Sequence, residues 1–327
     1  MNTGKIPENV LKRSILKVIK KRRGEVLVGA TVGGDCAVFR MGDLALSSVS
    51  TAEFGTDSGL RHAFVSSSNN IAAKGGETVG FLMSAVFPAD TEEPLIKETA
   101  LKAEKLAAEL GAQTVGGSTE ISDAVNRPVI SVTAVGRAEE TAFETLKNGA
   151  APGDSVILIG HIALEGTAAI AKAKEAELLK KFPADMIYRA ENFEKLMSVK
   201  KEAALAIKSG VTAMHDLSRG GVFAALWELA EHSGVGLETD LRKIPVMQES
   251  IEICNFYDIN PYELTSAGGL LVTAKDSKKL ISDLKKEGIE AVCIGVCTDS
   301  NDRVLINGES RRFLEIPKTD EIYKIIG

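Results

Sequence analysis

The segment from Asn148 to Asp154, NGAAPGD, constrains the fold most, because it divides the sequence into two halves with similar patterning. Glycine, proline and small residues favour a linker, and the strand-like run SVILIGH begins immediately after it. A chain of 327 residues also exceeds the usual size of one hydrophobic core. We therefore expect two domains, residues 1–150 and 151–327.

Each half mixes strand patterns with helix patterns. Alternating apolar residues in RPVISVTAVGRA predict a strand that is covered on one face. Apolar residues at helical spacing predict helices at 7–21, 62–74 and 92–110 in the first half, and at 165–181, 191–209, 220–232 and 277–287 in the second. The sequence therefore predicts an α/β (α+β) fold in which helices cover two sheets.

Composition narrows the possible partners and the compartment. A formal net charge of −6 argues against a nucleic-acid partner, because phosphate backbones attract an excess of Lys and Arg. No stretch approaches the roughly 20 apolar residues of a membrane helix, and the amino terminus lacks a signal-peptide core. The four cysteines lack the spacing of a zinc site or disulfide framework. We expect a cytoplasmic protein without a membrane partner.

Four glycine-containing stretches are the strongest candidates for a functional site. They are TVGGDCAVF (31–39), NNIAAKGGE (69–77), VGGSTEIS (115–122) and HDLSRGGV (215–222). None matches the P-loop or the dinucleotide-binding fingerprint. Taken singly, each glycine pair is either a turn, where the backbone needs positive φ, or a cradle for phosphate.

The order and flanks of these stretches resemble the superfamily of AIR synthase, thiamine-monophosphate kinase, selenophosphate synthetase and the hydrogenase-maturation dehydratase HypE. GGDCAVF is similar to the family's GDDAAVL, NNIAAKGG to NDLAAMGA, GGST to GGDT, and HDLSRGG to DPTRGG. PGDSVILIGHIALEGTA, LAEHSGVGLE and YDINPYELTSAGGLLVTA resemble the HypE-like, AIR-synthase-related branch. The resemblance covers roughly residues 29–308.

This resemblance implies a fold and a ligand. The expected architecture is PurM-like, with an amino-terminal domain whose strands pair across a homodimer into a barrel. ATP or another small phosphorylated ligand would bind in an interdomain cleft, with Mg²⁺ bridging its phosphates. The expected activity is ATP-dependent phosphoryl transfer, of a phosphotransferase, ligase-like or dehydratase type.

The resemblance also assigns roles to individual residues. Asp35 and Asp216 would bind the metal and serve catalysis. Two further candidates come from their neighbourhood: Glu120, two residues past Ser118, as a metal ligand, and His215, which adjoins Asp216, for catalysis. Nucleotide contacts would come from Gly33, Gly34, Asn69, Asn70, Gly116, Gly117, Ser118, Thr119, Arg219, Gly220 and Gly221.

Each polar assignment has a structural alternative. Asp216 could cap the helix that begins near Arg219, and Arg219 could pair with a carboxylate rather than a phosphate. Glu120 could be a solvated surface residue, and His215 could have an ordinary hydrogen-bonded role.

The sequence departs from the family where metal chemistry is most demanding. Gly34, Val49, Asn70 and Ser118 stand at positions that are acidic in the family pattern. Ser and Asn offer a cation only a dipole, whereas a carboxylate offers a full charge. A second hypothesis is therefore a non-catalytic dimeric scaffold, or a hydrogenase or other metalloenzyme maturation factor that works through a protein partner.

Overall fold

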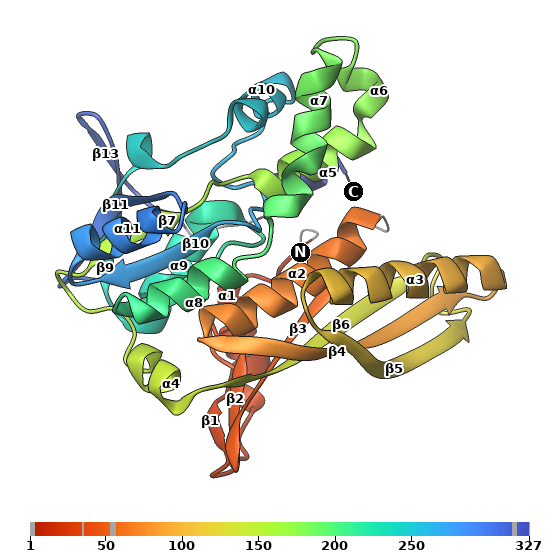
Figure 1. Ribbon diagram of the computed structural model, residues 1–327, viewed down its shortest axis with the longest axis horizontal. Coiled ribbons are helices and arrows are strands. Elements are labelled where there is room, and N and C mark those ends of the chain that lie inside the picture. Colours follow the sequence, from red (N-terminus) through yellow and green to blue (C-terminus); the bar gives the residue numbers. More distant parts are fainter. Residues whose placement is uncertain (1–3, 35, 53–56, 316–318, 327) are drawn as a thin grey trace.

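The structure is a computed structural model that describes residues 4–34, 36–52, 57–315 and 319–326. Two mixed sheets follow one another along the chain, and helices pack on both (Figure 1). The α/β class predicted from the sequence is confirmed. The exact domain boundary at residue 150 stays a prediction.

The first sheet has the strand order β1-β2-β3-β6-β4-β5. β3 and β4 flank β6 in antiparallel register, and β5 joins β4 in parallel at the edge. Helices α2 (Asp57–Ala73) and α3 (Glu93–Glu109) cover one face (Figure 1). The strands are β1 Val26–Val28, β2 Ala37–Met41, β3 Asp43–Ala52, β4 Gly76–Pro88, β5 Gln113–Ser122 and β6 Val129–Ala138.

The second sheet has the order β13-β12-β9-β11-β7-β10-β8. Its strands are β7 Ser155–Ile159, β8 Val211–Asp216, β9 Gly236–Asp240, β10 Leu270–Ala274, β11 Ala291–Thr298, β12 Arg303–Asn307 and β13 Ser310–Phe313. Every residue of strand β10, which lies between β7 and β8, is buried, because helices cover both of its faces. The helices are α4 Glu140–Leu146, α5 Leu164–Ala173, α6 Glu175–Leu178, α7 Ala184–Glu191, α8 Lys200–Lys208, α9 Gly221–Ser233, α10 Gln248–Phe256 and α11 Ser277–Lys286.

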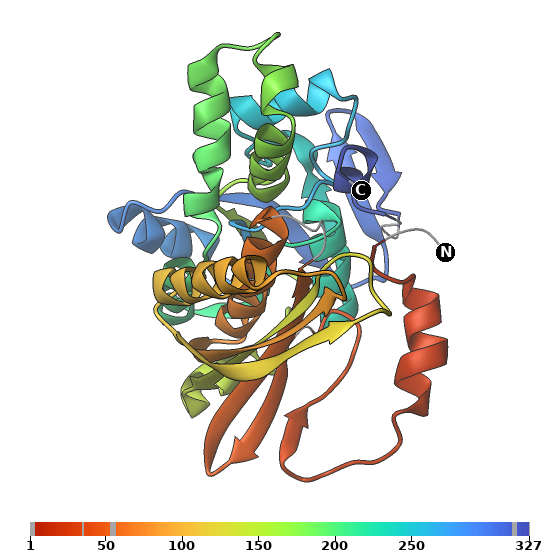
Figure 2. The ribbon, with the colours of Figure 1, turned by 90° about the vertical axis from the view of Figure 1, so that its right-hand side faces the viewer.

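The amino-terminal segment is shorter and less regular than the helix predicted at 7–21. It consists of α1 (Glu8–Val10), a π-helical stretch (Leu11–Ile15) and a 3-10 turn (Leu16–Val18). Ion pairs between Lys5 and Glu228 (3.1 Å) and between Lys12 and Glu231 (2.6 Å) attach it to α9 of the second domain. Figure 2 shows this segment along the side of the molecule.

Helix α2 lies between the first sheet and the second domain (Figure 1). Its polar run from Ser66 to Asn70 is buried. Asn69 holds the second domain through its amide, which donates to the Met197 carbonyl (2.8 Å) and accepts from the Val199 N–H (3.1 Å). Asn69 therefore serves the domain interface rather than solvent.

Two local predictions are wrong. VGGSTEIS is not a turn: it lies within the continuous strand β5, where Gly117 pairs with Met83. A Cβ on Gly117 would lie 1.8 Å from the Met83 carbonyl oxygen, so the glycine permits close strand pairing. The helix predicted at 191–209 is also broken, because α7 ends at Glu191 and α8 begins only at Lys200.

None of the helices in the described part of the chain is both long and apolar enough to cross a bilayer.

Candidate functional site

A buried polar cluster joins the two domains at the end of β8. The Asn70 amide lies between the Ser48 hydroxyl and the Asp216 carboxylate. With its nitrogen toward Asp216, it donates to Asp216 Oδ1 at 2.6 Å and accepts from Ser48 at 2.9 Å. All three side chains are buried. The cluster thus brings together two predicted site residues, Asn70 and Asp216, through a direct hydrogen bond.

Ser48, rather than Val49, faces this cluster from β3. Successive side chains of a strand point to opposite faces, so a shift of one residue reverses the direction. Val49 is 62% exposed and lies on the face of the sheet that the helices leave open. The placement of Val49 at a metal-facing position is therefore wrong for this chain.

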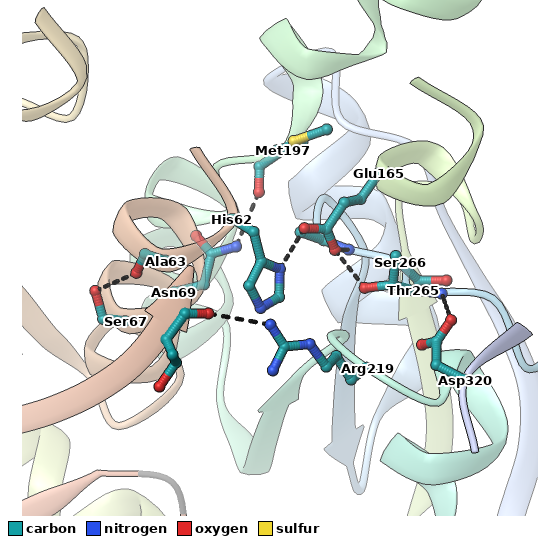
Figure 3. A network of polar contacts seen from close by, with 12 residues as sticks. His62, Ala63, Ser67, Asn69, Glu165, Met197, Arg219, Thr265, Ser266 and Asp320 are labelled. Carbon is teal, nitrogen blue, oxygen red and sulfur yellow. Dashed lines mark hydrogen bonds and ion pairs between the residues drawn. The ribbon is translucent and has the colours of Figure 1, made fainter. Parts of the chain in front are cut away.

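A second buried network crosses the same boundary (Figure 3). His62 on α2 forms an ion pair with Glu165 on α5, and Glu165 also accepts from the Thr265 hydroxyl (2.6 Å). Burial alone would raise the pKa of Glu165, but the His62 charge and the hydrogen bonds lower it to about 2. Sequence reasoning missed this pair, since the two residues lie 103 positions apart.

Asp320 extends this network toward the carboxyl terminus. Its carboxylate accepts hydrogen bonds from the backbone N–H groups of Gly220 (2.6 Å), Thr265 (3.2 Å) and Ile322 (2.9 Å). Burial nevertheless raises the pKa of Asp320 to about 7.

A cavity of about 280 Å³ opens beside these networks. Its charged lining includes Lys5 and Arg219 as well as Glu8, Glu228 and Asp320, and Trp227 and Tyr323 add aromatic surface. The amino-terminal segment, the turn at 31–34, the SRGG turn and residues 319–323 all contribute walls. Segments far apart in the sequence therefore meet at one cavity.

His215 does not line the cavity itself but contacts Glu228, which does. Its Nδ1–H donates to the Asp216 carbonyl (2.7 Å), and its Nε2 is 3.4 Å from Glu228, which lines the cavity. Burial alone would raise the pKa of Glu228, but Lys5 and His215 lower it to about 2. His215 can therefore influence a ligand through the charge of Glu228.

The other predicted residues lie in different parts of the fold. Gly33, Arg219 and Gly220 line the cavity, whereas Gly34 closes its turn through an N–H bond to the Thr31 carbonyl (3.3 Å). The β5 residues Gly116, Gly117, Ser118, Thr119 and Glu120 lie on an exposed edge strand, three strands from β3. There the Ser118 hydroxyl donates to Glu120 (3.1 Å). Asp35 lies outside the described residues.

Two of the glycines that the resemblance assigns to nucleotide contacts are also required by the packing of the chain. Gly33 has φ +66°, and a Cβ there would lie 2.6 Å from the Glu228 carbonyl oxygen. Gly221 has φ +62°, and a Cβ there would lie 2.5 Å from the Tyr262 carbonyl oxygen. The structural interpretation of these glycines and a role in ligand contact are compatible.

The residues present fit a phosphate-bearing ligand better than a bound cation. Arg219 and Lys5 are the cations of the cavity lining, although Lys5 is paired with Glu228 (3.1 Å), and the buried Thr319 hydroxyl has no hydrogen-bond partner among the described residues. In the same part of the chain, no three His, Cys, Asp or Glu side chains gather as a metal site. Asp216, the best-placed carboxylate, is held by the Asn70 amide.

The fold and the site define a class: a two-domain α/β protein with a cavity where its glycine turns and terminal segments meet. Family models for the AIR synthase related protein match residues 33–138 (N-terminal domain) and 151–307 (C-terminal domain). The chain belongs to the AIR synthase related family, as the sequence motifs predicted.

Individual relatives agree with this assignment. A putative hydrogenase expression/formation protein of Methanocaldococcus jannaschii is 24% identical, over 98% of this chain and 97% of that protein. The carbamoyl dehydratase HypE of Rhizobium leguminosarum is 27% identical, over 70% of this chain and 61% of its own length.

Solved structures of the same fold include a HypE–HypF complex, with a TM-score of 0.69 and 20% identity over 87% of this chain and 93% of that one. HypE in complex with ATP has a TM-score of 0.68 and 16% identity, covering 96% of this chain and 95% of that one.

Proposed function

We propose that this protein binds ATP or another phosphorylated small molecule in the cavity between its glycine turns. The observation that carries the proposal is the composition of the cavity wall, where Arg219, Gly220 and Gly33 meet Lys5. A structural neighbour that covers most of this chain is HypE in complex with ATP, which supports a nucleotide ligand.

The chemistry of the wall favours an anionic ligand with a flat apolar part. The Arg219 guanidinium, which donates to the Thr51 carbonyl (3.1 Å), has further N–H groups for phosphate oxygens. The Lys5 ammonium would attract them too, in competition with Glu228, its partner at 3.1 Å. The rings of Trp227 and Tyr323 offer apolar surface to a base. A volume of about 280 Å³ lies just below the usual range for ligand pockets, so the cavity accommodates part of a nucleotide as it stands.

Calorimetric titration with ATP, with and without Mg²⁺, tests this proposal. Wild-type protein should bind ATP, and Arg219→Ala should weaken binding by roughly tenfold, because it removes a cation from the wall. Arg13→Ala, which removes an exposed cation from the amino-terminal segment, is the matched control and should leave affinity unchanged. Absence of ATP binding in both metal conditions would contradict the proposal.

A second candidate function is a non-catalytic scaffold of metalloenzyme maturation. The hydrogen bond between Asn70 and Asp216 favours it, because the amide satisfies a carboxylate that would otherwise need a cation. The HypE–HypF complex among the structural neighbours makes a maturation protein the partner to test. ATP binding that Mg²⁺ strengthens by tenfold or more would argue for phosphoryl transfer instead.

We also propose a homodimer that forms through the open face of the first sheet. Register places Val49, Leu82 and Val135 on this face, and all three side chains are exposed. A group of exposed apolar side chains on one sheet face is typical of an interface. In a dimer of this kind, the exposed strand β5 would also gain a neighbour.

Light scattering coupled to size exclusion tests the dimer. Wild-type protein should elute with about twice the monomer mass of 34.7 kDa, and Leu82→Lys with Val135→Lys should shift it toward the monomer. Leu101→Lys changes an apolar residue on α3 that is more exposed than either, on the opposite side of the sheet, and should not cause this shift. A monomeric wild type would contradict the dimer without affecting ATP binding.

A further inference from the structure

Residues 319–326, which we name the C-terminal strap, form one wall of the cavity. Thr319, Asp320 and Tyr323 line it, and Ile322 is fully buried in the core of the second domain. The Glu321 N–H donates to the Glu263 carbonyl (3.3 Å), and the Glu321 carboxylate accepts from the Asn260 N–H (3.1 Å). The strap is thus docked on the loop that precedes β10.

Asp320 occupies a donor that the family resemblance assigns to phosphate. Its carboxylate oxygen lies 2.6 Å from the Gly220 nitrogen, in the SRGG turn at the start of α9. Carboxylate and phosphate oxygens compete for such a backbone N–H, because each is an anionic acceptor. The strap therefore places the chain's own anion at the edge of the ligand cavity.

The strap is also connected to the domain boundary. Thr265 donates its N–H to Asp320 and its hydroxyl to Glu165, which pairs with His62 on α2 (Figure 3). Docking of the strap and contact between the domains thus share Thr265. Release of Asp320 would leave the buried backbone N–H of Thr265 without its acceptor, so this N–H would need another one.

We propose that the C-terminal strap closes the cavity and that a phosphate-bearing ligand displaces Asp320 from Gly220. This inference rests on the proposed ligand binding and adds its regulation. One N–H cannot serve both anions fully, so ligand binding and strap docking oppose each other. The thermodynamic consequence is that any change which weakens strap docking strengthens ligand binding.

Calorimetry on the full chain tests this opposition, with ATP as the probe and inorganic phosphate as a second titrant. At pH 8, where Asp320 is charged because its pKa is about 7, Asp320→Asn keeps the shape of the side chain and removes its charge, and we expect ATP to bind roughly tenfold more tightly than to wild type. Glu309→Gln, an exposed carboxylate in the β12–β13 turn, is the control and should match wild type. Tighter binding of inorganic phosphate as well would identify the phosphate group as the competitor.

Amide hydrogen exchange on the wild-type protein provides a measurement that needs no variant. ATP should accelerate exchange at Ile322, whose N–H donates to Asp320 in the docked strap. Unchanged exchange, or equal ATP affinity in wild type and Asp320→Asn, overturns the strap inference while ATP binding stands. Failure of both proteins to bind ATP overturns the proposed function and this inference together.

Discussion

At the residue scale, Asn70 decides what the domain boundary can bind. Two carboxylates at this distance would repel each other unless a cation lay between them. The amide instead donates to Asp216 and accepts from Ser48, so the cluster is satisfied by the protein's own groups. A single substitution relative to the family pattern thus converts a candidate metal position into a hydrogen bond.

Asn70→Asp should therefore destabilise the protein by about 1–3 kcal/mol, because it replaces a buried hydrogen bond with like-charge repulsion. Mn²⁺ should recover part of that loss, since two carboxylates make a better cation site than one. Urea unfolding with and without Mn²⁺ measures both effects. Asn301→Asp adds the same charge at an exposed position, so it should neither lower the stability nor be stabilised by Mn²⁺. An equal Mn²⁺ response in this variant would refute the argument.

At the scale of single elements, strand β5 shows how glycine can serve pairing rather than turning. Gly116 and Gly117 have φ values of +148° and +150°, which other residues rarely adopt. Their surroundings differ, because a Cβ on Gly117 would collide with Met83, whereas a Cβ on Gly116 would meet nothing within 4 Å. Substitutions at these two glycines therefore distinguish the cost of backbone strain, which both would incur, from the cost of a steric clash, which only Gly117 would incur.

Gly117→Ala should consequently cost more stability than Gly116→Ala. The Gly116 variant should lose about 1–3 kcal/mol from backbone strain alone. The Gly117 variant should lose more and release β5 from β4, because the new methyl group would overlap the Met83 backbone. Urea unfolding gives the energies, and amide exchange along β5 reports the pairing. Equal losses in the two variants would count against close strand approach as the cause.

The strap contributes a pH dependence of its own. The pKa of Asp320 is raised from 3.8 to about 7, so its stabilising contribution is complete below pH 3.8 and is lost as the pH rises through about 7. The charged neighbour that raises this pKa further is Glu165. Asp320→Asn should therefore show less loss of stability than wild type between pH 4 and pH 8 in urea unfolding. If the stability of wild type and variant changed in parallel with pH, Asp320 would not be the origin of the pH dependence.

At the scale of the whole molecule, helix α2 unites the two domains through polar contacts. His62, Asn69 and Asn70 lie on it, and each contacts a different element of the second domain. Buried polar contacts of this kind need every partner in place, since a lost partner leaves an unsatisfied group. The two domains should therefore unfold together.

Glu165→Gln tests this coupling. It breaks the buried pair with His62 and should cost about 3 kcal/mol near neutral pH. Because the pKa of Glu165 is lowered from 4.5 to about 2, its contribution is present above pH 4.5 and is lost as the pH falls through about 2. The difference in the free energy of unfolding between wild type and variant should therefore shrink as the pH falls from 4.5 to about 2. Glu175→Gln, an exposed carboxylate on α6, should show no such difference at any pH.

The sequence by itself determined the fold class, the family and most helices and strands. Periodicity and glycine placement are local signals, which is why β6, α3, α9 and α11 were predicted close to their observed bounds. The motifs also mark Asn70, Asp216, Arg219 and Gly220 as candidate site residues, and these roles stay predictions.

Only the tertiary structure decided what these residues contact. The sequence could not show that GGST lies in an edge strand, because a glycine pair fits both a turn and a close strand pairing. Nor could it bring together Ser48 with Asp216, His62 with Glu165, or Asp320 with Gly220, since each pair depends on how the two domains pack. Local patterns specify elements, whereas contacts between distant residues arise only when those elements are assembled.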